Sequence, residues 1–127
     1  VKEAIKIKLG LSNELKLGNL DASRDWGHAK DYVYAMWLML QQDKEDDFVC
    51  STGISHTVKD LVSYVFTKLD MDWTNYVKTD QKYIRPEELE FLKGDCSKAK
   101  KVLGWKHHYT FESMLDEMIE YWMKKLG

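Results

Sequence analysis

The segment Leu17–Val33 carries the strongest structural signal in this sequence. It reads LGNLDASRDWGHAKDYV and joins a short apolar stretch to a polar turn, an arginine and the start of a helix. The Asn-Leu-Asp sequence is typical of a turn, and the apolar residues that follow at helical spacing over about residues 28–42 predict an amphipathic helix. The segment therefore places Arg24 after a turn and just before a helix begins.

A second segment, Ile84–Glu90, repeats this arrangement far along the chain. Arg85 precedes Pro86, the only proline, and Glu88 follows three residues after the arginine. Proline suits the first position of a helix, because its missing amide hydrogen would have no partner there. The sequence thus predicts a helix that Pro86 opens, with Arg85 immediately before it.

Arginine in such a setting suits phosphate. The planar guanidinium group offers paired donors that match phosphate oxygens two at a time, and it stays charged at any working pH. If Arg24 and Arg85 converge, with the Glu88 carboxylate for a ribose hydroxyl, they would form a clamp for a nucleoside diphosphate. The alternative is that both arginines lie on the surface in ordinary ion pairs.

Composition narrows the class of protein. A chain of 127 residues that is 44% hydrophobic and 13% aromatic is typical of one globular domain. The net charge of −2 gives no bulk attraction to nucleic acid or to an anionic membrane, and no apolar run approaches the length of a membrane span. Phosphate binding must therefore be local, and we expect neither a nucleic-acid partner nor a membrane partner.

The cysteines and the first residues bear on location. Cys50 and Cys96 are far apart and form no CxxC motif, so they are interpreted as free thiols in a reducing compartment. The first ten residues, VKEAIKIKLG, lack the apolar core of a signal peptide. These features predict a cytoplasmic protein.

Periodicity and capping signals predict an α+β fold, mostly helical, with a few short strands. About five helices are expected, and the helical signals lie near residues 1–11, 28–42, 57–69, 86 onward, 97–104 and 110–126. Short strands are expected near residues 15–18, 47–50 and 76–78. In the second helix one apolar stripe is formed by Ala29, Val33, Met36, Trp37 and Leu40.

The start of the chain suits a fragment of a longer protein, because the first helix has no N-cap residue before it. Its apolar residues would then normally pack against an absent amino-terminal half. We expect an exposed apolar patch involving Ala4, Ile5, Ile7 or Leu9.

Three strings carry a resemblance to a known family: LGNLDASRDWGHAKDYVYAMWLMLQ, DDFVCSTG and YIRPEELEFLKGDCSKAKKVLGWK. Together with the closing helix they resemble the carboxyl-terminal part of the GDP-mannose 4,6-dehydratase family, within the extended short-chain dehydrogenase/reductase superfamily. The similarity runs from about Ala4 to Leu126. The string RDWGHAKDYV is more specific than the looser pattern that nucleotide-sugar epimerases and dehydratases share, and the segment Gly94–Trp105 points to the same family.

The resemblance implies a substrate-binding lobe that lacks the Rossmann domain of the full enzyme. By this resemblance Arg24 and Arg85 contact the diphosphate of GDP-mannose or GDP, and Glu88 accepts from ribose hydroxyls. The backbone that borders the base and ribose would be that of Leu17, Gly18 and Asn19. Lys82 and Ile84 replace an arginine and a phenylalanine that are common in the family, which leaves the finer shape of the pocket open.

The resemblance also implies the activity of the full enzyme. That enzyme converts GDP-mannose to GDP-4-dehydro-6-deoxy-D-mannose, with NADP bound by an amino-terminal Rossmann half, and it is expected to be a homo-oligomer. This chain has no glycine-rich turn of the dinucleotide-binding type, and the Tyr-x-x-x-Lys match of Tyr121 with Lys125 is attributed to chance. No catalytic residue, metal site or cofactor site is therefore assigned to this chain, and it is expected to be inactive alone.

Two other classes stay open. The chain could be the lobe of a related nucleotide-sugar epimerase or reductase. It could also be a non-catalytic split subunit or interaction domain.

Overall fold

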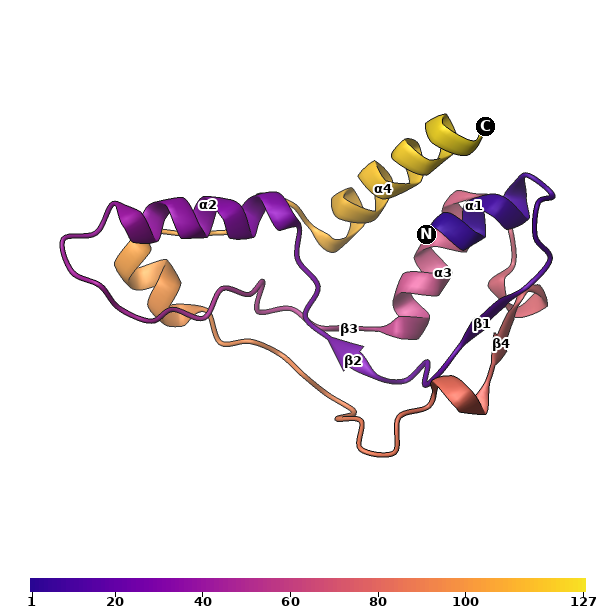
Figure 1. Ribbon diagram of the computed structural model, residues 1–127, viewed down its shortest axis with the longest axis horizontal. Coiled ribbons are helices and arrows are strands. Elements are labelled where there is room, and N and C mark those ends of the chain that lie inside the picture. Colours follow the sequence, from indigo (N-terminus) through magenta and orange to yellow (C-terminus); the bar gives the residue numbers. More distant parts are fainter.

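The computed structural model describes residues 1–127, and it is α+β with four α-helices and four short strands. The helices are α1 (Lys2–Lys8), α2 (Ala29–Leu40), α3 (Val58–Lys68) and α4 (Phe111–Leu126); the strands are β1 (Leu15–Leu17), β2 (Ser23–Arg24), β3 (His56–Thr57) and β4 (Val77–Thr79). Three short turns of other helix types are η1 (Trp73–Asn75), η2 (Gln81–Tyr83) and the π-helical η3 (Ala99–Leu103). Figure 1 shows an elongated arrangement, with α2 at one end and α1, α3, β1 and β4 at the other.

The strands form two separate pairs. β1 and β4 are parallel, with Leu15 opposite Val77 and Leu17 opposite Thr79. β2 and β3 are antiparallel, with Arg24 opposite His56. Because β1 and β4 run the same way, their carboxyl ends open at the same edge.

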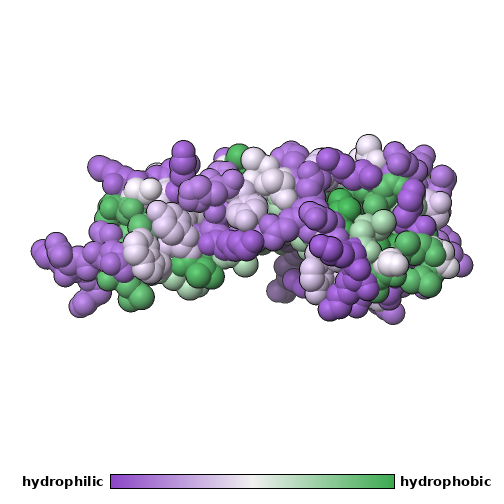
Figure 2. Space-filling view, turned by 90° about the horizontal axis from the view of Figure 1, so that it is seen from above, coloured by the Kyte–Doolittle hydropathy of each residue, from purple (hydrophilic) through white to green (hydrophobic).

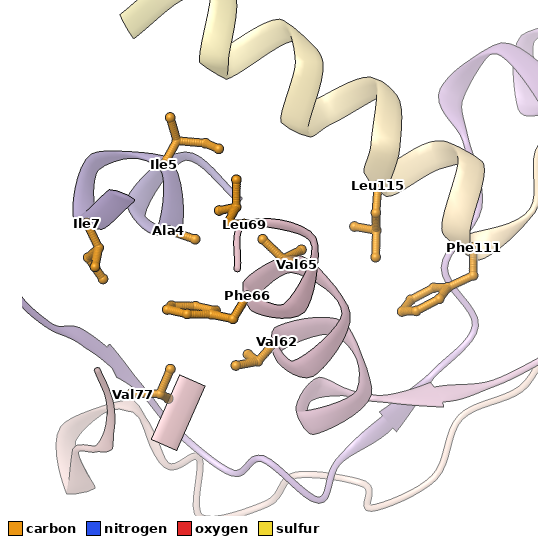
Figure 3. Close-up of a cluster of buried hydrophobic side chains, with 10 residues drawn as sticks. All are labelled: Ala4, Ile5, Ile7, Val62, Val65, Phe66, Leu69, Val77, Phe111 and Leu115. Atoms are coloured by element: carbon orange, nitrogen blue, oxygen red, sulfur yellow. The ribbon is translucent and has the colours of Figure 1, made fainter. Parts of the chain in front are cut away.

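The larger core lies between α1, α3 and α4 (Figure 3). Phe66 and Val65 of α3 are almost completely buried, as are Ile5 of α1 and Leu115 of α4. α3 begins at a capping box in which the Thr57 hydroxyl accepts from the Asp60 amide and the Asp60 carboxylate accepts from the Thr57 amide. The predicted starts of α3 and of α4, which Thr110 caps, are thus confirmed.

The prediction of an exposed patch on the first helix is wrong. Ala4, Ile5 and Ile7 are buried, at 1%, 0% and 6% exposure, and Leu9 is half-buried. The physical reason is that the apolar faces of α3 and α4 cover α1 within the chain itself.

A smaller core lies at the other end of the molecule, where α2 meets η3. Its buried residues are Ala35, Cys96, Ala99, Leu103 and Trp105. Both cysteines are free thiols, and desolvation raises the pKa of the half-buried Cys50. Gly104, at a φ of 65°, closes η3 at the predicted position.

The exposed apolar surface lies on α2. The predicted helix is confirmed, yet Val33, Met36, Trp37 and Leu40 are 62%, 60%, 55% and 82% exposed. α2 lies along the upper side of the left-hand end in Figure 1, and Figure 2, seen from above, shows hydrophobic residues on the surface at that end. Only one side of α2, including Ala35, faces the smaller core.

Two predicted elements do not form. Residues 47–50 are not a strand, because no other strand of the chain lies beside them to complete a ladder. The helix predicted from Pro86 is also absent. Instead Ser23 pairs with this segment: its amide donates to the Glu90 carbonyl at 2.6 Å and its carbonyl accepts from the Leu92 amide at 3.0 Å.

α4, with 16 residues, is the longest helix, and none of the helices combines the length and apolar character that crossing a membrane requires.

Candidate functional site

A cavity of ≈ 410 Å³ opens beside the carboxyl ends of β1 and β4. Four of the six residues predicted as a site line it together: Gly18, Asn19, Arg85 and Glu88. They come from two segments more than 60 residues apart in the sequence. The parallel pairing of β1 with β4 brings these segments together.

The floor of the cavity is built by backbone contacts. The Asp80 amide donates to the Leu17 carbonyl at 2.8 Å, which turns the chain after β4 across the end of β1. Gly18 lies against the backbone of Tyr83, and a Cβ atom there would collide with the Tyr83 carbonyl. Gly18 is therefore required for this close approach. Leu17 itself does not line the cavity, because its side chain packs against the larger core.

Arg24 is connected to the cavity through Glu88. Its guanidinium group donates to Glu88 Oε1 at 3.1 Å, to the Leu89 carbonyl at 2.7 Å and to the Ser23 carbonyl at 2.8 Å. Arg24 does not line the cavity, and its ion pair with Glu88 is about three-quarters shielded from solvent. In this arrangement Arg24 fixes the loop that carries Arg85 and Glu88.

Arg85 is exposed at the cavity and forms no ion pair or side-chain hydrogen bond with the rest of the chain. All five of its donors are therefore free for a ligand. An unpaired guanidinium group beside a carboxylate and exposed backbone offers both cation and acceptor to a phosphorylated sugar.

Lys59 and Trp73 also line the cavity, and neither was expected from the sequence. Lys59 comes from the first turn of α3 and Trp73 from η1, so no local motif links them to Arg85. The turn at Trp73 is fixed by Asp72, whose carboxylate accepts from the Thr74 hydroxyl at 2.7 Å and from the Thr74 amide at 3.0 Å. These two hydrogen bonds lower the pKa of Asp72.

The other polar residues of RDWGHAKD hold the fold. The Asp25 carboxylate accepts from the Thr52 hydroxyl at 2.6 Å and from the Thr52 and Gly53 amides. His28 Nδ1 accepts from the Lys30 amide at 3.0 Å and caps α2. Since Nδ1 is an acceptor, neutral His28 carries its proton on Nε2, which lies 3.2 Å from Glu117 Oε2.

Comparison with known proteins identifies a family. The family model described as GDP-mannose 4,6 dehydratase matches residues 1–118. The chain is 53% identical over 115 residues to GDP-mannose 4,6 dehydratase 2 of Arabidopsis thaliana, covering 91% of this chain and 31% of that protein. It is 44% identical over 135 residues to the Homo sapiens GDP-mannose 4,6 dehydratase, covering 93% of this chain and 36% of that protein. The chain thus spans about a third of the length of these relatives.

Solved structures share the fold. The Pseudomonas aeruginosa RMD structure, complexed with NADPH, matches 98% of this chain and 41% of its own, with a TM-score of 0.87 and 20% identity. A dTDP-glucose 4,6-dehydratase from Bacillus anthracis, in complex with NAD, matches 98% of this chain and 38% of its own, with a TM-score of 0.81 and 21% identity.

Proposed function

The chain belongs to the GDP-mannose 4,6-dehydratase family, and we propose that it is the substrate-binding lobe of such an enzyme. Its ligand is GDP-mannose, or GDP as the part of that substrate that carries the charge. The observation that carries the proposal is the single cavity that holds Gly18, Asn19, Arg85 and Glu88.

The chemistry of the cavity suits this ligand. Arg85 has its donors free, so it pairs with diphosphate oxygens. Glu88 has one oxygen bonded to Arg24 and keeps acceptor capacity for ribose hydroxyls. The backbone at Leu17, Gly18 and Asn19 borders the base and ribose. Arg24 has five donors and directs two hydrogen bonds to the loop and one to the Ser23 carbonyl, which leaves two donors for the diphosphate.

The full enzyme that we propose converts GDP-mannose to GDP-4-dehydro-6-deoxy-D-mannose and uses NADP, which supplies the hydride chemistry. The residues of this chain do not fit a dinucleotide cradle. Gly18 follows β1, but a turn and β2 come next rather than a helix whose amino terminus could face a pyrophosphate. We therefore assign NADP to an amino-terminal Rossmann half, and the contribution of this chain is to bind and orient the substrate.

The exposed face of α2, formed by Val33, Met36, Trp37 and Leu40, is the surface that we propose packs against that half. The relatives are about three times as long as this chain, so they contain enough protein to cover it. A compact monomer of this mass exposes about 7,000 Å². This chain exposes 8599 Å², an excess that is consistent with an uncovered interface. Homo-oligomer formation would belong to the full enzyme.

Replacement of Arg85 tests the proposed site. Arg85→Ala should weaken GDP binding to this chain by about tenfold to a hundredfold, the value of a charged hydrogen bond of about 1.5–3 kcal/mol. Isothermal titration calorimetry measures this, with Lys44→Ala as the control for loss of one exposed positive charge away from the cavity. An unchanged affinity in Arg85→Ala would rule out the phosphate contact. UDP and dTDP, titrated in parallel, separate this family from related nucleotide-sugar enzymes.

A further inference from the structure

We infer that a second cavity, between α2 and α4, is a docking pocket that receives apolar side chains of the amino-terminal half. This pocket shares no lining residue with the candidate nucleotide site. The inference rests on the proposed function, because it requires a longer protein in which this chain is one lobe.

The docking pocket is built by the start of α2 and one side of α4. Ala29 lines it from α2, and Met114, Met118 and Tyr121 line it from α4. The three α4 residues are spaced by four and three positions, so they lie on one side of that helix. Figure 1 shows α4 starting near one end of α2 and running away from it, and the pocket of ≈ 420 Å³ lies where the two helices are close.

Glu117 holds the two helices at this distance. Its Oε2 lies 3.2 Å from Nε2 of His28, the residue that caps α2, and its Oε1 lies 3.4 Å from Nζ of Lys30. These contacts join α4 to the first turn of α2 within this chain. The pocket is therefore formed before a partner binds, which lowers the entropic cost of docking.

The lining suits an apolar partner better than a phosphorylated ligand. Five of its eight residues are hydrophobic, against three of twelve in the nucleotide cavity. No lysine or arginine lines it, and the carboxylate of Glu117 would repel a phosphate. The methionine side chains are flexible and polarisable, so they adapt to the shape of an incoming side chain.

The docking pocket continues the exposed apolar face of α2. Ala29 lies on the same stripe as Val33 and Leu40, and it is itself exposed. Beyond the pocket, Met118 and Tyr121 are 40% and 52% exposed on α4. One apolar surface therefore extends along α2, into the pocket and onto α4, and a large contiguous surface of this kind marks an interaction site.

The amino-terminal half is the occupant that fits this position. The relatives are about three times as long as this chain, so they contain the protein needed to cover the surface. In the proposed enzyme that half precedes Val1. The next residue, Lys2, has its Nζ 4.8 Å from the centroid of the Trp122 ring, and Trp122 lines the pocket. The half would therefore join this chain beside the pocket.

Calorimetric titration of the 127-residue chain with the separately expressed amino-terminal part of the Arabidopsis thaliana relative tests the pocket. Met118→Lys should weaken docking by at least about tenfold, because it places a charge at the centre of an apolar contact. Leu11→Lys is the matched control, since it adds the same charge at an exposed apolar position outside the pocket, and it should leave docking unchanged. Both variants should bind GDP as the unmodified chain does.

Nuclear magnetic resonance of the chain labelled with ¹³C at its methionine methyl groups gives a second readout that needs no substitution in the pocket. The Met114 and Met118 signals should shift when the unlabelled amino-terminal part is added. The Met71 signal should not, because Met71 packs against the larger core and does not line the pocket.

The outcomes separate this inference from the proposed function. If Met118→Lys docks normally and the Met114 and Met118 signals do not move, the pocket is not the docking surface, whatever the GDP titrations show. If the amino-terminal part does not bind the unmodified chain, the inference also fails, while the effect of Arg85→Ala on GDP affinity still decides the proposed function. If Met118→Lys reduces self-association in light scattering but leaves docking unchanged, the occupant is a second copy of the chain and the inference is overturned.

Discussion

At the scale of single residues, Asp31 is a buried carboxylate that joins the start of α2 to the segment before α4. Asp31 lies in the first turn of α2 and is 2% exposed. Oδ1 accepts from the His108 amide at 2.9 Å and Oδ2 from the Tyr109 amide at 3.0 Å, while its backbone carbonyl accepts from Trp105 Nε1 at 2.9 Å. Since negative charge is also favourable at a helix start, this carboxylate stabilises both α2 and the segment before α4.

Asp31→Asn should therefore lower the free energy of unfolding by about 1–3 kcal/mol. An amide has one acceptor oxygen, so its NH₂ group would face a buried backbone donor and leave that donor unpaired. Urea unfolding followed by circular dichroism measures the effect. Asp43→Asn, an exposed aspartate in the loop after α2, is the control and should change stability by less than about 0.5 kcal/mol. Equal stabilities for the two variants would show that the Asp31 network contributes little.

At the scale of elements, α2 is amphipathic in its sequence but unpartnered on its broad apolar face. The burial of such a stripe, at about 25 cal/mol per Å² of apolar surface, normally supplies most of the stability of a helix. In this chain α2 is held instead by the His28 cap, Asp31 and the contact of Ala35 with the smaller core. We therefore expect the uncovered face to be a surface for association.

We predict that the isolated chain self-associates through this face as its concentration rises. The double substitution Val33→Lys and Leu40→Lys should reduce that association, because it places two charges in the patch. Multi-angle light scattering over a range of concentrations measures the mass. Leu11→Lys is the control, because Leu11 is also 65% exposed but follows α1, and α1 lies at the opposite end of the molecule from α2 (Figure 1). If the control reduces association as strongly, the contact does not involve α2.

At the scale of the whole molecule, we predict that this chain alone has no dehydratase activity, with or without added NADP. Hydride transfer needs a bound dinucleotide, and proton removal needs a base held within hydrogen-bond distance of the sugar. Incubation of GDP-mannose with the purified chain, followed by chromatography of the nucleotide sugars, should show substrate only. Addition of a separately expressed amino-terminal half of a relative is the positive control and should restore turnover if the lobes dock. Formation of the 4-dehydro product by the chain alone would overturn the assignment of chemistry to the other half.

The sequence predicted four of the residues that line the candidate site, but it did not predict two others. Motif and resemblance singled out Gly18, Asn19, Arg85 and Glu88, which line one cavity. They gave no sign of Lys59 or Trp73, because those residues enter the cavity from α3 and η1, elements that carry no phosphate-binding pattern. These two residues reach the cavity only because α3 and β4 pack against β1.

The features that can be predicted correctly from the sequence are those that local interactions set. The starts of α3 and α4 follow from Thr57 and Thr110, since a capping hydrogen bond spans only three residues. The remaining features depend on contacts between segments that are distant in the sequence. The segment after Pro86 is extended rather than helical because Ser23 supplies its hydrogen bonds. The apolar residues of α1 are buried, while those of α2 are exposed, because α3 and α4 cover the first helix and nothing within these 127 residues covers the second. Periodicity shows that a helix has an apolar face, but burial of that face requires a partner surface, and the pattern does not identify the partner.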